Sequence, residues 1–171
     1  TYLQDNSHTI SLLTAFPDLS DGFKYDITVT VTDAAKNVST VLRTNVTYDI
    51  TPPQISTTNP SLVNKTTSSP AWAKVGEIVK LEFTTDETIR RPTVTFKTGG
   101  TSFANASDIK YVLKGDDIYD TSGKNWTAEY TTDENDEEGK IFYKIDFTDL
   151  AGNVGTPKIG PDSPSLQFDK T

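Results

Sequence analysis

The chain contains the phrase VTVTDAAKNV at residues 29–38 and a close copy, IDFTDLAGNV, at residues 145–154. Each copy is a stretch of alternating apolar and polar residues that ends in Thr-Asp and, three residues later, continues into Asn-Val. Strict alternation is typical of a half-buried β-strand, and Asp and Asn favour tight turns. The two copies therefore predict one strand–turn–strand element that recurs at an offset of 116 residues.

The segments that follow the two copies also end alike, in TYDIT at residues 47–51 and QFDKT at residues 167–171. Aligning these ends gives a repeating unit of about 120 residues. Two prolines follow the first of them, and they fix the backbone and predict a stiff joint. We therefore expect a complete unit over residues 52–171, and over residues 1–51 only the last strands of another unit.

The rest of the chain has the rhythm of many short strands. Turn signals rich in Gly, Asp and Ser separate the alternating stretches, and no apolar stripe of helical period exceeds two turns. Short strands with turns every 8 to 12 residues predict an all-β sandwich. The expected strands cover residues 24–32, 41–48, 77–85, 92–98, 125–132, 140–148 and 165–168.

The repeated element resembles the bacterial Ig-like repeats of large surface proteins and adhesins, which read TDxAGN, then a strand, then DxTPP. The segments FTDLAGNVGT at residues 147–156 and YDITPP at residues 48–53 carry this resemblance. It is densest over residues 21–53 and 137–155, and only the strand rhythm continues it between them. The first copy has Lys36 where the family has Gly. Such a Gly commonly has a positive φ, which costs Lys about 1 kcal/mol.

The resemblance implies a Greek-key Ig-like β-sandwich and a place in a tandem array on a cell surface. We expect a structural or adhesive extracellular protein: a segment or subunit of a stalk, fibre or pilus-like filament. Its partners would be neighbouring Ig-like domains or identical subunits. The incomplete first unit implies either a chain taken from a longer array or strands supplied by another chain. The alternative function is a carbohydrate- or calcium-binding Ig-like module of an adhesin.

Composition argues against other classes of function. The formal net charge of −8 disfavours nucleic acid and anionic membrane surfaces as partners. There is no Cys, so the chain has neither disulfides nor a Cys-based metal site, and no apolar run is long enough to span a membrane. His8 is the single His, which leaves no Ser-His-Asp or Cys-His nucleophile system. We expect no enzyme and no cofactor other than calcium.

The acidic turns allow two interpretations, a structural turn and a calcium-binding site. In the simpler reading, Asp33 and Asp149, with Asn37 and Asn153, accept and donate the hydrogen bonds that close the repeated turn. In the other, these residues bind calcium at a domain junction, with Asp49 as a third carboxylate.

The segment TTDENDEEGK at residues 131–140 is the second acidic stretch, with Asp133 and Asp136 as its calcium candidates. It lacks the ligand spacing of an EF-hand loop, and a solvated hairpin turn explains the same acids.

The sequence also carries candidate sites for sugars. Trp72 and Trp126 are read as packing residues, although an exposed Trp can stack on a sugar ring. Asn-x-Ser/Thr motifs, which accept N-linked glycans on the surface of secreted proteins, occur five times. They start at Asn37, Asn45, Asn64, Asn105 and Asn125.

Overall fold

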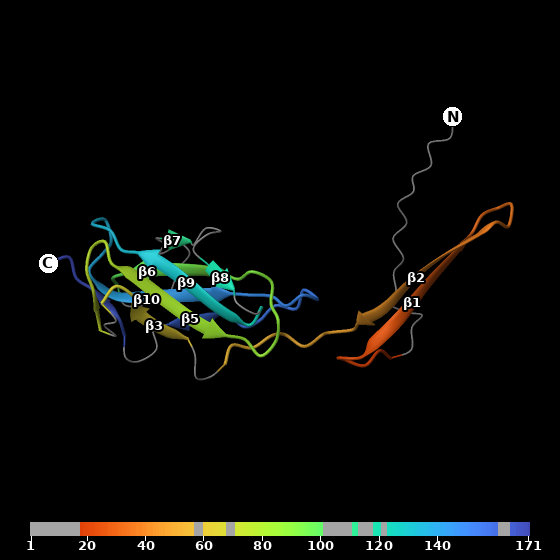
Figure 1. The fold of residues 1–171 in the computed structure, drawn as a ribbon, viewed down its shortest axis with the longest axis horizontal. Coiled ribbons are helices and arrows are strands. Elements are labelled where there is room, and N and C mark those ends of the chain that lie inside the picture. The colour runs from red at the N-terminus through yellow and green to blue at the C-terminus, as the bar shows by residue number, and fades with distance from the viewer. Residues whose placement is uncertain are drawn as a thin grey trace, which may run out of the picture. The chain divides into compact units, whose positions relative to one another are not determined.

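The computed structural model describes residues 18–56, 60–67, 71–100, 111–112, 118–120, 123–160 and 165–171. It divides into two compact units, Thr1–Ile50 and Thr51–Thr171, here called unit 1 and unit 2 (Figure 1). The dividing point lies one residue before the boundary predicted from the repeat. The described residues form strands and turns, and none of them builds a helix long and apolar enough to cross a membrane.

Unit 2 consists of short strands that pack as two sheets. Alternation places one side of each strand inside, as in β9, where Trp126, Ala128 and Tyr130 are buried and the residues between them are not. The strands are β3 (Ser61–Asn64), β4 (Trp72–Ala73), β5 (Ile78–Thr84), β6 (Thr93–Thr98), β7 (Tyr111–Val112), β8 (Ile118–Asp120), β9 (Asn125–Thr131), β10 (Gly139–Asp146), β11 (Lys158–Gly160) and β12 (Gln167–Phe168).

The strand order of unit 2 is that of an Ig-like sandwich. One sheet has the order β3-β5-β9-β8 and the other β4-β12-β10-β6-β7, with β11 also pairing with β10. In Ig-like folds the sheets are A-B-E-D and C-F-G. Strands β3, β5, β9 and β8 take the first set of positions, and β6, β10 and the pair β11 and β12 take the second. The predicted Ig-like β-sandwich is therefore confirmed.

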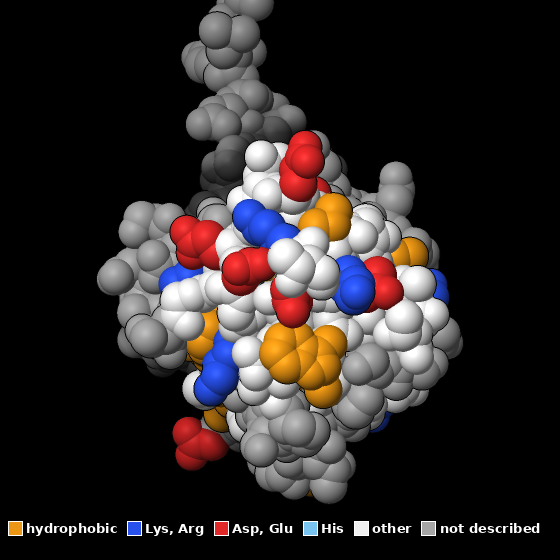
Figure 2. All heavy atoms as spheres, turned by 90° about the vertical axis from the view of Figure 1, so that its left-hand side faces the viewer, with side chains coloured by type: hydrophobic (Ala, Val, Ile, Leu, Met, Phe, Trp, Pro, Cys, Tyr) orange, Lys and Arg blue, Asp and Glu red, His pale blue; other side chains and the backbone are white. Residues whose placement is uncertain are grey.

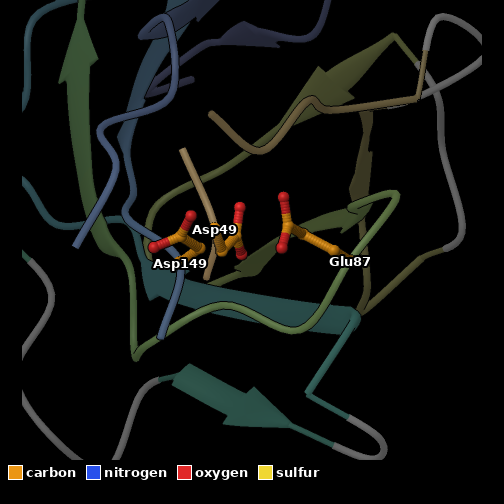
Figure 3. A group of neighbouring side chains, drawn as sticks. All are labelled: Asp49, Glu87 and Asp149. Atoms are coloured by element: carbon orange, nitrogen blue, oxygen red, sulfur yellow. The ribbon is translucent and has the colours of Figure 1, made fainter. Parts of the chain in front are cut away.

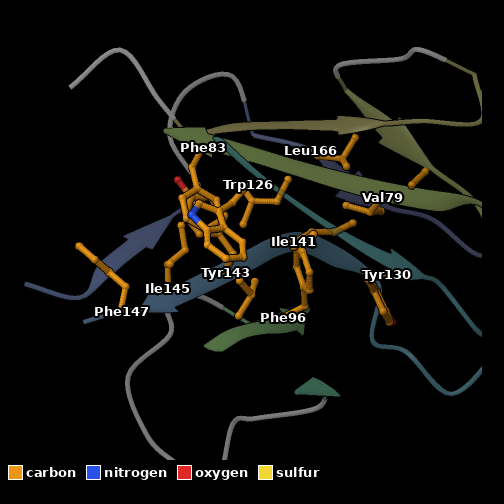
Figure 4. Packing of buried hydrophobic residues seen from close by; sticks show 14 of the residues in the cluster. Val79, Phe83, Phe96, Trp126, Tyr130, Ile141, Tyr143, Ile145, Phe147 and Leu166 are labelled. Carbon is orange, nitrogen blue, oxygen red and sulfur yellow. The ribbon is translucent and has the colours of Figure 1, made fainter. Parts of the chain in front are cut away.

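The core of unit 2 lies between the two sheets (Figure 4). Alternate residues of β5 and β9 meet alternate residues of β10 and β6, and Phe96 and Tyr130 stack across the sheets with ring centroids 5.5 Å apart. Burial of these side chains supplies the main driving force for folding. The largest fully buried apolar side chains are Tyr143, Phe83, Phe96, Phe168, Leu81, Ile141, Ile145 and Leu166.

In unit 1, the described residues form one antiparallel hairpin of β1 (Lys24–Thr32) and β2 (Val38–Thr47). Tyr25, Ile27, Val29 and Val31 alternate along β1, as predicted, but none of them is fully buried. The same alternating positions of β10 in unit 2 are inside the core. The repeated strand is therefore packed against a second sheet in unit 2, whereas in unit 1 no second sheet covers it among the described residues.

The short strands β3, β4, β7 and β8 were not expected from the sequence, and two further details of the strands differ from the prediction. The strand expected at residues 165–168 is observed as β12, and a further strand, β11, precedes it. The segment after the second turn therefore pairs with β10 twice, once before and once after a Pro-containing stretch of the sequence. In unit 1, β2 begins earlier than expected and its register with β1 shifts near Asn45, which has φ 57°. Alternation alone does not reveal such a β-bulge, because the bulge inserts one unpaired residue into an otherwise regular ladder.

Ile145→Ala tests whether the ladder of β10 forms the core of unit 2. Ile145 is fully buried, so its truncation leaves a cavity, and we expect a loss of about 2 to 5 kcal/mol in the free energy of unfolding. Ile159→Ala is the control, since Ile159 lies on neighbouring β11 but is half-exposed, and should cost less than about 1 kcal/mol. Urea unfolding followed by Trp fluorescence reports on unit 2, because Trp72 and Trp126 both lie there. Equal losses would contradict this assignment.

Candidate functional site

The repeated turn of unit 2 is built around the side chain of Asp149. Its Oδ1 accepts hydrogen bonds from the backbone N–H groups of Gly152 (2.6 Å) and Asn153 (2.8 Å). Its Oδ2 accepts a hydrogen bond from the side-chain Nδ2 of Asn153 (2.7 Å). The backbone closes the same turn, because the Asp149 N–H donates to the Asn153 carbonyl at 3.1 Å. Asp149 is buried, so these donors replace the water that an exposed carboxylate would have.

The turn of unit 1 repeats this geometry on an exposed hairpin. Asp33 Oδ1 accepts the Asn37 backbone N–H, and Asp33 Oδ2 accepts the Asn37 Nδ2, both at 2.8 Å. Lys36 has φ 69° where the second copy has Gly152 with φ 106°. The positive φ expected at the Lys position is therefore confirmed, and the hydrogen bonds of Asp33 and Asn37 hold the turn despite its strain.

The hydrogen bonds of both turns favour the charged carboxylate. For Asp149, burial raises the pKa, but the hydrogen bonds from Asn153 and Gly152 outweigh it and hold the pKa below its ordinary value. For Asp33, the side-chain and backbone hydrogen bonds from Asn37 lower the pKa. Each turn therefore carries a full negative charge near neutral pH that is already satisfied by its own backbone and by one Asn.

A second carboxylate of unit 2 approaches the Asp149 turn. Ile89, in the connection between β5 and β6, forms an isolated antiparallel bridge with Asp149, and this brings Glu87 near. Carboxylate oxygens of Glu87 and Asp149 lie within 4.8 Å of one another (Figure 3). No sequence motif marks Glu87, because a long-range bridge places it there.

Two carboxylates in unit 2 are well short of the six to eight oxygens that calcium takes. Asn153 Oδ1 and the backbone carbonyls of the turn are further oxygen donors of the type calcium accepts. Asp49, the third carboxylate of the predicted site, belongs to unit 1. Calcium at this turn therefore stays a prediction.

The acidic turn between β9 and β10 has Asp136 pointing inward. Asp136 accepts hydrogen bonds from the Tyr130 hydroxyl, from the Asp133 backbone N–H (2.9 Å) and from the Thr98 hydroxyl (3.4 Å). Asp133 in turn accepts the Asn135 N–H at 2.6 Å. In the described part of the chain, no third carboxylate joins Asp133 and Asp136 at ligand distance. This network fixes the turn to β6 and β9, as a structural turn requires.

The face of unit 2 at its C-terminal end carries acidic and basic side chains interspersed (Figure 2). A compact hydrophobic group lies among them on this face. Opposite charges that alternate over a surface give no strong field of one sign to collect cations. The face therefore lends little support to calcium capture by the acidic turn.

The predicted glycan acceptors differ in their accessibility and in the hydrogen bonds of their side chains. Asn64 is buried, and its Nδ2 donates to the Trp72 carbonyl (2.9 Å) and to Glu77 Oε2 (2.7 Å), so it is not accessible in the folded unit. Asn37 uses its amide in the turn. Asn45 lies exposed at the bulge, and its side-chain amide has no hydrogen-bond partner among the described residues.

Two further acceptors differ from Asn45. Asn125 is exposed, and its Oδ1 accepts the Thr84 hydroxyl at 3.0 Å. Asn105 lies outside the described residues. Asn64 is thus corrected to a structural residue, since an alternating sequence does not reveal that its side chain caps the segment after β3.

The two tryptophans have different environments. Trp126 is buried between the sheets, as expected for a packing residue, and its Nε1 has no hydrogen-bond partner among the described residues. Trp72, on the edge strand β4, is 53% exposed, so only part of its ring packs against the sandwich. An exposed aromatic ring can stack on a sugar, and this part of the alternative function stays a prediction.

A shallow depression of about 200 Å³ lies beside the end of β10. The Asp146 carboxylate in it is paired with Lys144 at 2.8 Å, on the outer side of the strand. His8, the single His, lies outside the described residues. The depression is lined by Arg91, Thr93, Asp146, Phe147, Thr148 and Val154.

Comparisons with known proteins add little to the strand order. No family model matches the chain, and no curated protein matches it. Among solved structures, the one described as "Crystal structure of Dpr1 IG1 bound to DIP-eta IG1" is 16% identical, with 70% of this chain and 95% of that chain covered and a TM-score of 0.34. We draw nothing from a likeness at that TM-score, and the Ig-like assignment rests on the topology.

Asn153→Ala tests the role of the hydrogen bonds at the Asp149 turn. The change leaves Asp149 Oδ2 without its side-chain donor, and we expect a loss of about 1 to 3 kcal/mol in the free energy of unfolding of unit 2 at neutral pH. Because the folded-state pKa of Asp149 is depressed, its contribution is present above the unfolded pKa and is lost as the pH falls through the folded one. The variant should raise that pKa and lose stability from a higher pH.

Urea unfolding at several pH values and an NMR titration of the Asp149 carboxyl measure both effects. Asn37→Ala is the matched control, since it removes the same hydrogen bond from the turn of unit 1. It should leave the unfolding of unit 2 unchanged. An unaltered Asp149 titration in Asn153→Ala would contradict the assignment.

Exposure of Asn45 predicts which acceptor can receive a glycan. When the folded chain is treated with an N-glycosylating enzyme and a sugar donor, peptide mass spectrometry should find the sugar on Asn45 and none on buried Asn64. Thr47→Ala, which destroys the motif but keeps Asn45, should remove the modification. Modification of Asn64 in the folded chain would show that its burial is misassigned.

Proposed function

We propose that the chain is a segment of a non-catalytic, extracellular structural or adhesive protein in which Ig-like units in tandem form a stalk or fibre. The repeat of one strand–turn–strand element in both units supports a tandem array. At the start of unit 2, Pro52 is exposed and Pro53 is buried, which suits a stiff attachment of the chain to the sandwich. The net charge of −8 suits an exposed surface that repels its neighbours.

The observation that carries the proposal is the parallel pairing of β4 with β12, the last strand of unit 2. The Gln167 N–H donates to the Ala71 carbonyl at 2.8 Å, and the Asp169 N–H donates to the Ala73 carbonyl at 3.0 Å. Within unit 2 the first residues and the C-terminus lie at opposite ends of the sandwich (Figure 1). Tension between these ends pulls the two parallel strands in opposite directions, so the bonds are loaded together rather than one after another.

The alternative of an enzyme has less support in the described residues. A catalytic site needs titratable groups that converge in a concave, water-excluding pocket. The depression beside β10 is shallow, and its acid is already paired with a lysine. The aspartates of the repeated turns and of the β9–β10 turn, Asp33, Asp149, Asp133 and Asp136, accept backbone N–H groups, as structural turns require.

Gln167→Pro tests whether the β4–β12 pair bears load. Proline has no N–H to donate to the Ala71 carbonyl, so the variant loses one of the sheared bonds, worth about 1 kcal/mol. In single-molecule force spectroscopy of the chain, we expect a lower mean unfolding force for unit 2. Unfolding of its roughly 120 residues should lengthen the chain by roughly 400 Å in wild type and variant alike.

Glu134→Pro serves as the control, because Glu134 follows Asp133 in the β9–β10 turn, where the Asp136 N–H bonds to the Asp133 carbonyl. Proline is favoured at this position of a turn, so the unfolding force should be unchanged. An equal loss of force in both variants, or a wild-type chain that extends without a force peak, would overturn the load-bearing role.

A further inference from the structure

Three side chains form a row across the outer face of the β4-β12-β10-β6-β7 sheet of unit 2. In register, Trp72 of β4 lies opposite Gln167 of β12, and Gln167 lies opposite Lys140 of β10. The next residues along β4 and β12, Ala73 and Phe168, are in the core, so the row lies on the face turned away from it. Adjacent strands are about 4.8 Å apart, which puts the backbones at the two ends of this outer row roughly 10 Å apart.

The backbone that carries Trp72 is held from both sides. The N–H groups of Gln167 and Asp169 donate to the carbonyls of the residues before and after Trp72. The carbonyl of Trp72 itself accepts a hydrogen bond from Asn64 Nδ2 at 2.9 Å. The indole is therefore attached to an ordered edge strand while 53% of the residue is exposed. A platform that is ordered in advance lowers the entropy cost of binding a ligand.

The two polar side chains of the outer row have unused hydrogen-bonding groups. Gln167 is half-buried and Lys140 is exposed, and within the described part of the chain neither side chain has a hydrogen-bond or ion-pair partner. The acids two positions away along the chain are engaged, because Asp169 and Glu138 each accept a backbone N–H from residues 170–171. The row therefore presents an aromatic ring beside one carboxamide and one ammonium that can still bond to a ligand.

This combination of groups fits a sugar. The C–H groups on the face of a pyranose ring can pack on an indole, and sugar hydroxyls both donate and accept hydrogen bonds, as the Gln167 carboxamide does. An ammonium only donates, so Lys140 suits the lone pairs of a hydroxyl or a ring oxygen. The net charge of −8 disfavours a polyanionic glycan. A row of roughly 10 Å across three strands suits two successive sugars of a straight chain better than one ring.

We propose that the outer row is a binding site for a neutral, straight oligosaccharide of β-1,4-linked pyranoses. One sugar stacks on Trp72, and the next lies over Gln167 and Lys140, which bond to its hydroxyls. Equatorial hydroxyls lie around the edge of such rings and leave their faces apolar, so one chain can stack and hydrogen-bond at once. This inference goes beyond the proposed structural role and depends only on the geometry of unit 2.

Cellotetraose, a neutral β-1,4-linked tetramer of glucose, is the probe for an NMR titration of the whole chain. The chain has two tryptophans and therefore two indole N–H signals, which Trp72→Phe assigns. We expect a saturable shift of the Trp72 signal and none of the signal of buried Trp126. Maltotetraose, which has a bent α-1,4-linked chain, and anionic tetragalacturonate should bind at least about tenfold more weakly.

Substitutions in the outer row test each contact separately. Trp72→Ala should abolish binding, because it removes the stacking surface. Gln167→Ala and Lys140→Ala each remove one hydrogen bond to the sugar and should weaken binding roughly threefold to tenfold. Lys144→Ala is the matched control, since Lys144 lies on the same face of β10 but is paired with Asp146 at 2.8 Å, and it should leave binding unchanged.

Urea unfolding checks that each variant is folded, and the two polar variants test the site even if Trp72→Ala does not fold. The absence of a saturable shift with cellotetraose would overturn the proposal. Equal or tighter binding of maltotetraose or tetragalacturonate would also overturn it, as would wild-type affinity in both Gln167→Ala and Lys140→Ala. Gln167→Ala keeps the N–H that Gln167→Pro removes, so it should not change the unfolding force of unit 2. Failure of the sugar site and failure of the load-bearing role are therefore distinguishable.

Discussion

The antiparallel ladder between β10 and β6 is the constraint on which unit 2 depends. Its register places Ile141, Tyr143 and Ile145 inside the sandwich. A shift of one residue would turn these side chains to the surface and expose the apolar face. The same ladder leads β10 into the Asp149 turn, while β11 and β12 return along the other side of β10. Core, turn and last strands are therefore positioned by one pairing.

The two copies of the turn separate local from tertiary effects. In both, an aspartate accepts hydrogen bonds from the backbone N–H and from the side-chain amide of the asparagine four residues later. The hydrogen-bond pattern is therefore local, and it forms in the exposed turn as well as in the buried one. The surroundings of each aspartate, in contrast, depend on distant segments of the chain. Asp149 is buried next to Glu87 because the connection between β5 and β6 bridges to it, whereas Asp33 closes an exposed hairpin. The turn is thus a joint in both units, and its approach to another carboxylate in unit 2 depends on the sandwich.

The sequence predicted best where a strand is long and strictly alternating. The apolar faces of β1, β5, β9 and β10 follow from periodicity, because a half-buried strand must place alternate residues in the core. Short strands were missed, including β3, β4 and β11, since two to four residues are too few to show a period. From the sequence, Asn64 and Asp136 are expected to be surface residues. Both are turned inward by hydrogen bonds to groups far along the chain, at Glu77 and Thr98.

By itself, the sequence determined the repeat, the strands that alternate, the positive φ at Lys36 and the hydrogen-bonding residues of the turn. These depend on side chains and dihedral angles within a few residues of one another. Tertiary structure decided which copy is covered, which strand lies beside which, and which acids and asparagines are accessible. Those properties arise from pairings between distant segments, such as β6 with β10 and β4 with β12. One short phrase can therefore lie on a core strand in unit 2 and, among the described residues of unit 1, on the exposed strand of a hairpin.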